Sequence, residues 1–392
     1  MTAHRLDPAR LIGDAIDQAG SDDFGEAGWE EGLDRLADSL QLEGRLSELG
    51  VEVAAGDLTG YLVNRLRLTA WRTAHPEVAD EGIDQPVIVV GQPRTGTTIL
   101  FDLLAQDPAL RAPLTWEVDQ PVPPPEPATY DTDPRIEVSD ATLQMADLLI
   151  PGFTDFHPLG ARLGQECVRI TAGDFKSMIF GTQYRVPTYN RWLLDEADLT
   201  SAYRYHRRYL QHLQSGGVRG QWLLKSPAHL WHLDALAAEY PDAVVVQTHR
   251  DPLKVIASVS ALVAHLRRMA SDETSVEETA AEYADDIFVG LDRGIGARER
   301  GVFPEGQEVD VHFADFVADP LATIARLYTA MGRNLTDEAA DAMRAFLAAN
   351  PGDGGGGGTR YRWADTGLDA DVERARAKRY QEVCHVASEP VR

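Results

Sequence analysis

The chain has 392 residues, of which 44% are hydrophobic and 25% charged, which suits one large α/β domain with helical additions. Its formal net charge of −25 argues against nucleic acid and anionic membranes as general partners, although a few local cations and backbone N–H groups can still bind a small anion. With two cysteines, Cys167 and Cys384, the chain has neither a disulfide framework nor a paired-cysteine zinc motif.

Residues 1–85 are predicted to be mostly helical. Leucines recur there at helical intervals, first at Leu33, Leu36 and Leu40 and again at Leu58, Leu62 and Leu66. No residue in this stretch is a candidate for catalysis or ligand binding, so we interpret it as a helical cap.

Acidic residues interrupt the first 20 positions, which argues against a signal peptide. Because no apolar stretch approaches the roughly 20 residues that span a bilayer, we expect no membrane span and a cytoplasmic protein.

From residue 86 onward, short apolar runs alternate with helix-forming stretches. The runs are Val87–Val90, Trp222–Leu224, Ala243–Val246 and Val309–Phe313. Helices are expected over Thr98–Gln106, His229–Glu239 and Pro252–Met269. This alternation predicts βαβ units and an α/β fold with a central, mostly parallel sheet. We expect residues 86–392 to form this domain, continuous with the helical extension at 1–85.

The segment Gly91–Thr98 lies between an apolar strand and a helix, where a phosphate-binding loop is found. Glycine lets backbone N–H groups approach an anion, and the helix N-terminus adds partial positive charge. Position 97 is threonine, whereas loops that bind nucleoside triphosphates have lysine there, and Arg94 supplies a cation instead. The loop therefore suits a shorter anion than a triphosphate. A plain strand-to-helix turn is the alternative. The candidate ligands are Pro93, Arg94, Thr95, Gly96, Thr97 and Thr98.

A second candidate anion site follows the apolar run at residues 243–246. Arg250 comes at the end of the expected strand, and Ser258 lies eight residues later in the expected helix (258 − 250 = 8). The planar fork of an arginine suits phosphate. The alternative is a surface ion pair of Arg250 with Asp251 or Asp242.

Together these residues resemble the sulfotransferase family, in particular its bacterial branch, from Asp23-Phe24-Gly25 to Gly367-Leu368. The resemblance implies a P-loop-like three-layer fold and 3′-phosphoadenosine 5′-phosphosulfate (PAPS) as the sulfate donor, with no metal. It assigns the loop at 93–98 to the 5′-phosphosulfate, and Arg250 and Ser258 to the 3′-phosphate. The run Gly354–Gly358 resembles the family's late loop over the donor, which makes Arg360 and Tyr361 further donor contacts.

Sulfuryl transfer needs a base for the acceptor hydroxyl and positive charge at the leaving phosphate. Arg94 and Lys225 are the candidates for that charge. Family members that act on phenols and steroids have a catalytic histidine two residues after the lysine, but this chain has Pro227. His229 is one substitute, or else it caps the next helix.

Other branches of the family use a glutamate at about the position of Glu117, beside Trp116. We expect burial beside an indole to raise the pKa of such a carboxylate and strengthen it as a base. The alternative is a glutamate that only orders the proline-rich segment at 121–127. Glu166 and His157 are further candidates for catalysis or substrate contact.

The acceptor is predicted to be a small molecule with a hydroxyl group, an apolar alcohol or phenol or else a carbohydrate. Several aromatic side chains suit an apolar pocket beside the proline-rich segment, although scattered aromatics more often belong to the core. They are Trp116, Phe153, Phe156, Tyr184, Tyr189 and Trp192. Bases and aromatics alternate over 203–209, which we interpret as an amphipathic helix rather than a nucleic-acid site. The sequence is compatible with a homodimer.

Two other functions remain open at this point. One is a P-loop nucleotide kinase or related phosphotransferase, against which the missing lysine argues. The other is a non-catalytic nucleotide-binding protein of the same fold.

Overall fold

The computed structural model describes residues 5–149, 160–350 and 361–391, and the chain forms two compact units. The first unit comprises residues 1–83, 113–219 and 265–274, and the second comprises 84–112, 220–264 and 275–392. Residues 1–83 thus share a unit with 113–219. The expected division into 1–85 and 86–392 stays a prediction.

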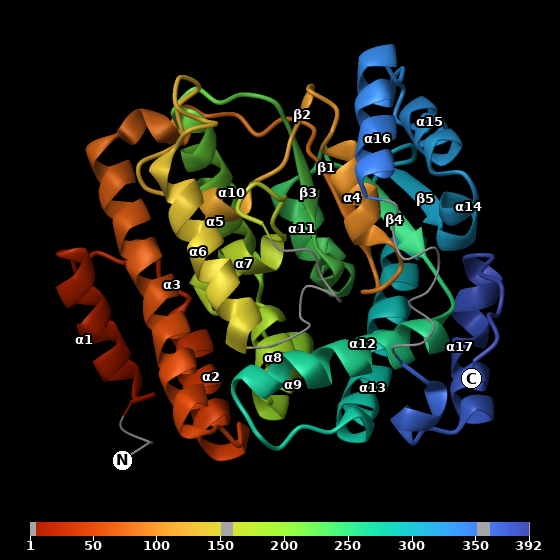
Figure 1. Cartoon of the computed structure of the whole chain (residues 1–392), viewed down its shortest axis with the longest axis horizontal. Helices are drawn as coiled ribbons and strands as arrows, with labels where there is room; N and C mark the ends of the chain where they lie inside the picture. The colour runs from red at the N-terminus through yellow and green to blue at the C-terminus, as the bar shows by residue number, and fades with distance from the viewer. Residues whose placement is uncertain (1–4, 150–159, 351–360, 392) are drawn as a thin grey trace. The chain divides into compact units, whose positions relative to one another are not determined.

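The first unit is helical, as predicted for the N-terminal segment. Its α-helices are α1 (Pro8–Ala19), α2 (Glu30–Glu43), α3 (Glu48–Ala74), α5 (Thr115–Asp119), α6 (Pro134–Leu149), α7 (Cys167–Thr171), α8 (Ile179–Gln183), α9 (Pro187–Asp195) and α10 (Thr200–Ser215). Short 3₁₀ turns are η2 (Pro76–Asp80), η3 (Ala172–Asp174) and η5 (Arg267–Met269). Figure 1 shows α1 lying beside α3. The leucines of the helical pattern are buried, which confirms their predicted core role.

Helix α10 contains the alternating bases and aromatics. Tyr203, Tyr205 and Tyr209 are buried, whereas Arg204 and Arg208 form ion pairs with Glu26. The pattern is therefore the buried and polar faces of one amphipathic helix, as predicted. In the part of the chain that the structure describes, no helix is long and apolar enough to cross a membrane.

The second unit is built on a sheet of five parallel strands, counted over the described residues. The strands are β1 (Val87–Gly91), β2 (Leu110–Arg111), β3 (Gln221–Lys225), β4 (Val244–His249) and β5 (Glu308–His312), in the order β2-β3-β1-β4-β5. Four of these strands were predicted from their apolar runs. Strand β2 was not, because two residues carry no periodicity.

The helices of the second unit are α4 (Thr97–Leu104), α11 (Leu233–Glu239), α12 (Pro252–Leu266), α13 (Val276–Glu299), α14 (Phe313–Ala318), α15 (Pro320–Ala330), α16 (Asp337–Ala349) and α17 (Ala370–Val383). Three of them were predicted, and two of these, α4 and α12, begin within one residue of the expected position. A 3₁₀ turn, η4 (Pro227–Trp231), precedes α11 and another, η7 (Trp363–Thr366), precedes α17. Because η4 takes up residues 227–231, the helix expected from His229 begins only at Leu233.

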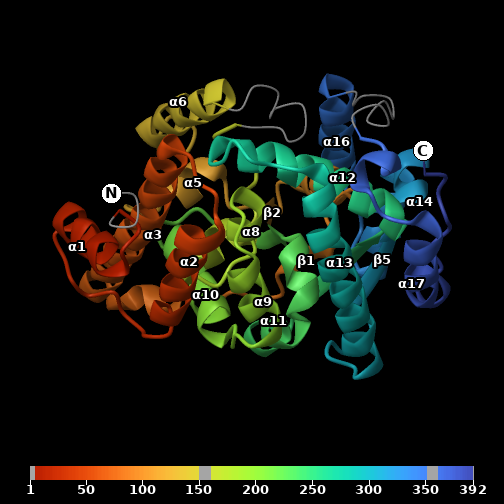
Figure 2. The same ribbon diagram turned by 90° about the horizontal axis from the view of Figure 1, so that it is seen from below.

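The sheet is covered by helices on both faces, which gives three layers. Val246 of β4 belongs to a buried cluster with α4, α15 and α16. The next residue, Gln247, points to the opposite face, where its Oε1 accepts hydrogen bonds from Arg298 of α13. Figure 1 shows α4, α15 and α16 beside the strands, and Figure 2 shows α13 and α17 next to each other. The predicted α/β fold with a parallel sheet is confirmed.

Parallel strands bring their carboxyl ends to one edge of the sheet. Gly91 pairs with Thr248, and Val89 pairs with Lys225, so the ends of β1, β3 and β4 are aligned. The loop after β1, Lys225 at the end of β3 and Arg250 after β4 therefore share this edge.

Candidate functional site

The loop Gly91–Thr98 is held closely against β4. The Thr95 hydroxyl donates to the carbonyl of Gln92 at 2.6 Å and lies 2.6 Å from the hydroxyl oxygen of Thr248. The Gln92 side chain donates to the carbonyl of Ile287 in α13 at 3.0 Å. The N-cap residue of α4 is Gly96, which has no side chain to cap the helix, so the first-turn N–H groups suit an anion.

Gly91 is required by its backbone conformation and its neighbour. Its φ is +133°, and a Cβ there would lie 2.4 Å from Oγ1 and 2.6 Å from the carbonyl oxygen of Thr248. We expect Gly91→Ala to lower the free energy of unfolding by about 3 kcal/mol, through left-handed strain and overpacking. Chemical denaturation measures this change.

Gly296→Ala is the matched control for Gly91→Ala, since it lies in α13 of the same unit. A Cβ there meets only the end of the flexible Arg300 side chain at 3.2 Å. Alanine is favoured over glycine within a helix, so stability should be unchanged or slightly higher. Equal stability of the two variants would contradict the expected close contact at Gly91.

The structure brings the two predicted anion sites together. Arg94, which has a positive φ of +67°, donates from Nε to the buried hydroxyl of Ser258 at 3.0 Å. Arg250 donates from Nη1 to the carbonyl of Arg94 at 3.2 Å, and its guanidinium carbon lies 4.0 Å from the ring centroid of Phe313. The loop Gly91–Thr98, the end of β4 and helix α12 therefore contribute hydrogen-bond donors that are connected to one another.

The ion-pair partner of Arg250 is not among those considered from the sequence. Its Nε and Nη2 donate to the two carboxylate oxygens of Glu389 at 3.0 and 3.2 Å. Asp242 instead accepts from the backbone N–H of Gln85, and Asp251 pairs with Arg374. The alternative of a pair with Asp251 or Asp242 was wrong. Glu389 had no sequence signal, because it lies 139 residues from Arg250.

Lys225 supplies a cation to the loop from the neighbouring strand. Its side chain is buried at the end of β3, and its Nζ donates to the hydroxyl of Thr98 at 3.3 Å. The same Nζ lies 5.5 Å from the ring centroid of Phe101 in α4. An ammonium group thus reaches the first turn of α4, although position 97 is threonine.

His229 is buried in the η4 turn that follows β3. The N-cap residue of α11 is His232, so His229 does not cap the next helix. A role for His229 as a base stays a prediction.

Glu117 and Trp116 lie in the short helix α5 of the first unit, and both are fully buried. Glu117 accepts a hydrogen bond from the backbone N–H of Leu114 at 2.7 Å, which stabilises the first turn of the helix. The guanidinium carbon of Arg135 lies 4.7 Å from the Trp116 ring centroid. Glu166 is the N-cap residue of α7.

The aromatic side chains that were candidates for an acceptor pocket are buried where the structure describes them. Phe153 and Phe156 lie outside the described residues. Tyr184 donates to Asp57 at 2.6 Å, and Tyr189 donates to the carbonyl of Phe175 at 2.8 Å. Such buried, hydrogen-bonded rings are typical of a core.

The remaining candidates are only partly covered by the structure. His157, Arg360 and the run Gly354–Gly358 lie outside the described residues, whereas Tyr361 is described and half-buried. Within the described ranges, no group of three or more His, Cys, Asp or Glu residues is arranged to hold a metal ion.

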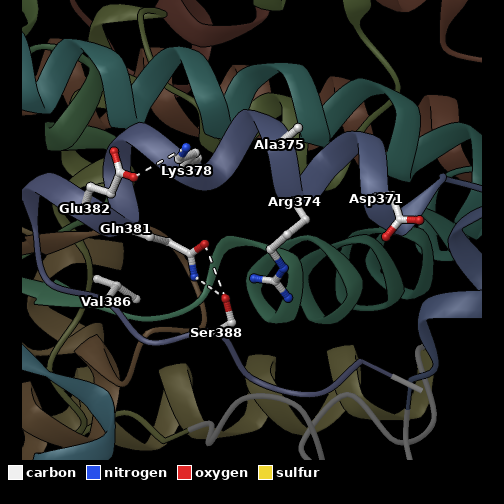
Figure 3. Close-up of a pocket in the computed structure, with 8 residues that line it drawn as sticks. All are labelled: Asp371, Arg374, Ala375, Lys378, Gln381, Glu382, Val386 and Ser388. Atoms are coloured by element: carbon white, nitrogen blue, oxygen red, sulfur yellow. Dashed lines mark hydrogen bonds and ion pairs between the residues drawn. The ribbon is translucent and has the colours of Figure 1, made fainter.

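An open surface pocket of about 590 Å³ lies along α17 (Figure 3). It is lined by Asp371, Arg374, Ala375, Lys378, Gln381, Glu382, Val386 and Ser388. Gln381 hydrogen-bonds to Ser388 across the pocket. This bond joins the C-terminal segment, residues 384–391, to α17. None of the predicted site residues lines this pocket.

Comparisons with known proteins agree on one family. The model of the sulfotransferase family matches residues 86–337. The structure is similar to that of sulfotransferase STF1 from Mycobacterium tuberculosis H37Rv, with a TM-score of 0.82 and 34% identity over 94% of this chain and 97% of that one. It is also similar to sulfotransferase STF9 from Mycobacterium avium, with a TM-score of 0.88 and 30% identity over 97% of each chain. A search of curated protein sequences found no match.

Proposed function

The chain belongs to the sulfotransferase family, and from this premise we propose that it transfers a sulfuryl group from PAPS to the hydroxyl of a small acceptor. The favoured acceptor is an apolar alcohol or phenol, and a carbohydrate is the other class.

One observation carries the choice of donor: Arg94, within the loop Gly91–Thr98, is hydrogen-bonded to both Ser258 and Arg250. PAPS carries anionic groups at both its 3′ and 5′ positions, so its recognition requires two anion sites close together. The N–H groups at the start of α4, which follow the N-cap glycine Gly96, suit the 5′-phosphosulfate. The buried hydroxyl of Ser258 and the fork of Arg250 suit the 3′-phosphate.

The guanidinium of Arg94 donates a hydrogen bond to Ser258, which is assigned to the 3′-phosphate. This position favours a contact of Arg94 with the 3′-phosphate over a contact with the leaving group. Lys225 is then the better candidate for the leaving group, because its ammonium lies at the first turn of α4.

In the proposed reaction the acceptor hydroxyl gives up its proton to a base, and its oxygen forms a bond to sulfur. The bond between sulfur and the 5′-phosphate oxygen breaks, which leaves adenosine 3′,5′-bisphosphate (PAP). The chain's part is to hold the donor in line and to balance the charge that develops on the leaving oxygen. We assign the charge to Lys225 and the base to Glu117, with His229, Glu166 and His157 as the other candidates.

Calorimetry with PAP, compared with ATP and magnesium, tests the donor. We expect tighter binding of PAP, and we expect Arg250→Ala to weaken PAP binding about 100-fold, because a charge-assisted fork to phosphate is lost. Arg379→Ala is the control, since it removes an exposed cation on α17 that pairs with Asp292 and Glu299.

A preference for ATP would favour a kinase-type phosphotransferase. An unchanged PAP affinity in Arg250→Ala would contradict the assigned 3′-phosphate site. Transfer of labelled sulfate from PAPS to a panel of alcohols, phenols and sugars then identifies the acceptor class. Binding of PAP without transfer to any of them would favour a non-catalytic protein of the same fold.

A further inference from the structure

The guanidinium that is proposed to bind the 3′-phosphate already holds a carboxylate from the chain's own C-terminal segment. Both carboxylate oxygens of Glu389 accept from one edge of Arg250, through Nε at 3.0 Å and Nη2 at 3.2 Å. A phosphate would use the same two-donor edge, because its oxygens have matching spacing. The third nitrogen, Nη1, donates to the carbonyl of Arg94.

The Phe313 ring, 4.0 Å from the guanidinium carbon, further restricts how Arg250 can turn. The edge formed by Nε and Nη2 cannot bind a phosphate while it holds Glu389. The two anions therefore compete for the same donors.

The backbone of Glu389 is anchored independently of its side chain. Its N–H donates to Asp251 at 2.6 Å, and its carbonyl accepts from Arg374 at 3.3 Å. Asp251 is fully buried and also pairs with Arg374, whose side chain extends from α17 toward the C-terminal segment in Figure 3. The Glu389 side chain, which is 34% exposed, can therefore rotate away from Arg250 while the backbone of the segment stays in place.

We propose that Glu389 is a residue of the donor site, where its carboxylate takes the position of the 3′-phosphate and leaves it when the nucleotide binds. This inference rests on the proposed function. Glu389 then weakens binding of nucleotides that carry a 3′-phosphate, the product PAP included. A competing carboxylate at this position favours product release, because it re-forms the pair with Arg250 as PAP departs.

The test is calorimetry with PAP and with adenosine 5′-monophosphate (AMP), which lacks the 3′-phosphate. We expect Glu389→Gln to tighten PAP binding about 5-fold, since a neutral amide competes less well than a carboxylate for a partly exposed arginine. AMP binding should not change. In the Arg250→Ala background, Glu389→Gln should have no effect on PAP.

Glu382→Gln is the matched control, because it removes the same charge from an exposed position on α17 that pairs only weakly with Lys378 at 3.7 Å. It should leave PAP binding unchanged, which separates direct competition from the loss of one charge in an acidic chain. Thermal unfolding of each variant checks that the C-terminal segment remains folded, and Glu389→Ala provides a second variant without any side-chain hydrogen bond.

The two proposals fail in different ways. If wild-type protein prefers PAP through Arg250 but Glu389→Gln and Glu389→Ala bind PAP equally or more weakly, the competition is overturned and the donor assignment stands. If wild-type protein binds PAP no better than AMP and Arg250→Ala changes nothing, the donor assignment fails and the competition fails with it.

Discussion

Lys225→Met is expected to lower turnover about 10²–10³-fold, the usual effect of removing one group that stabilises transition-state charge. The ammonium of Lys225 reaches the hydroxyl of Thr98, at the start of the helix proposed to hold the 5′-phosphosulfate. The leaving oxygen gains its negative charge only as the bond to sulfur breaks, so kcat should fall much more than the affinity for PAPS, in which the bond is still intact. Methionine is chosen because it is unbranched and fills the buried space beside Phe101.

Rates of labelled-sulfate transfer, together with calorimetry of PAPS in the absence of acceptor, measure the two parts of this effect. Lys378→Met serves as control, since it removes an exposed cation of α17 in the same unit. Thermal unfolding shows whether the loss of a buried cation has changed the fold. Turnover within a few-fold of wild type in a folded Lys225→Met protein would rule out the proposed role.

Glu117→Gln is expected to abolish turnover while PAP binding is kept. The loss of a general base costs about 10²–10⁴-fold, and an amide cannot take up the acceptor's proton. Glutamine keeps a carbonyl oxygen that can accept the hydrogen bond from the Leu114 N–H. The substitution therefore removes proton transfer and preserves the contact that stabilises α5.

Single-turnover transfer with PAPS and an active acceptor measures this loss, with Glu137→Gln as a control. Glu137 is exposed in α6 of the same unit, so the same chemical change there should be silent. If Glu117→Gln retained full turnover, Glu117 would have only its structural role at the start of α5. His229 would then be the next candidate to replace.

Much of the second unit could be predicted from local sequence patterns. The apolar run at Val87–Val90 indicated β1, and the loop after it was located because glycine, strand and helix signals occur together. Strands β3, β4 and β5 had similar signals. Strand β2 and the η4 turn were missed, because two residues have no period and Pro227 starts a 3₁₀ turn before α11.

The candidate site was predicted less completely. Ser258 and Arg250 are close in sequence, and their spacing along a strand end and a helix could be evaluated directly. The residues that contact the side chains of Lys225 and Arg94 could not be predicted in this way. Thr98 lies 127 residues from Lys225, and Ser258 lies 164 residues from Arg94. No local pattern carries such pairings.

By itself, then, the sequence determined the loop Gly91–Thr98, its strand and its helix, because backbone conformation and apolar periodicity act over a few residues. Only the tertiary structure decided which cation reaches that loop and which carboxylate holds Arg250. The order β2-β3-β1-β4-β5 places the end of β3 beside β1, which brings Lys225 to Thr98. The anchoring of the C-terminal segment on Asp251 brings Glu389 to Arg250. Both contacts arise from the packing of distant segments, which strand order sets and local sequence does not encode.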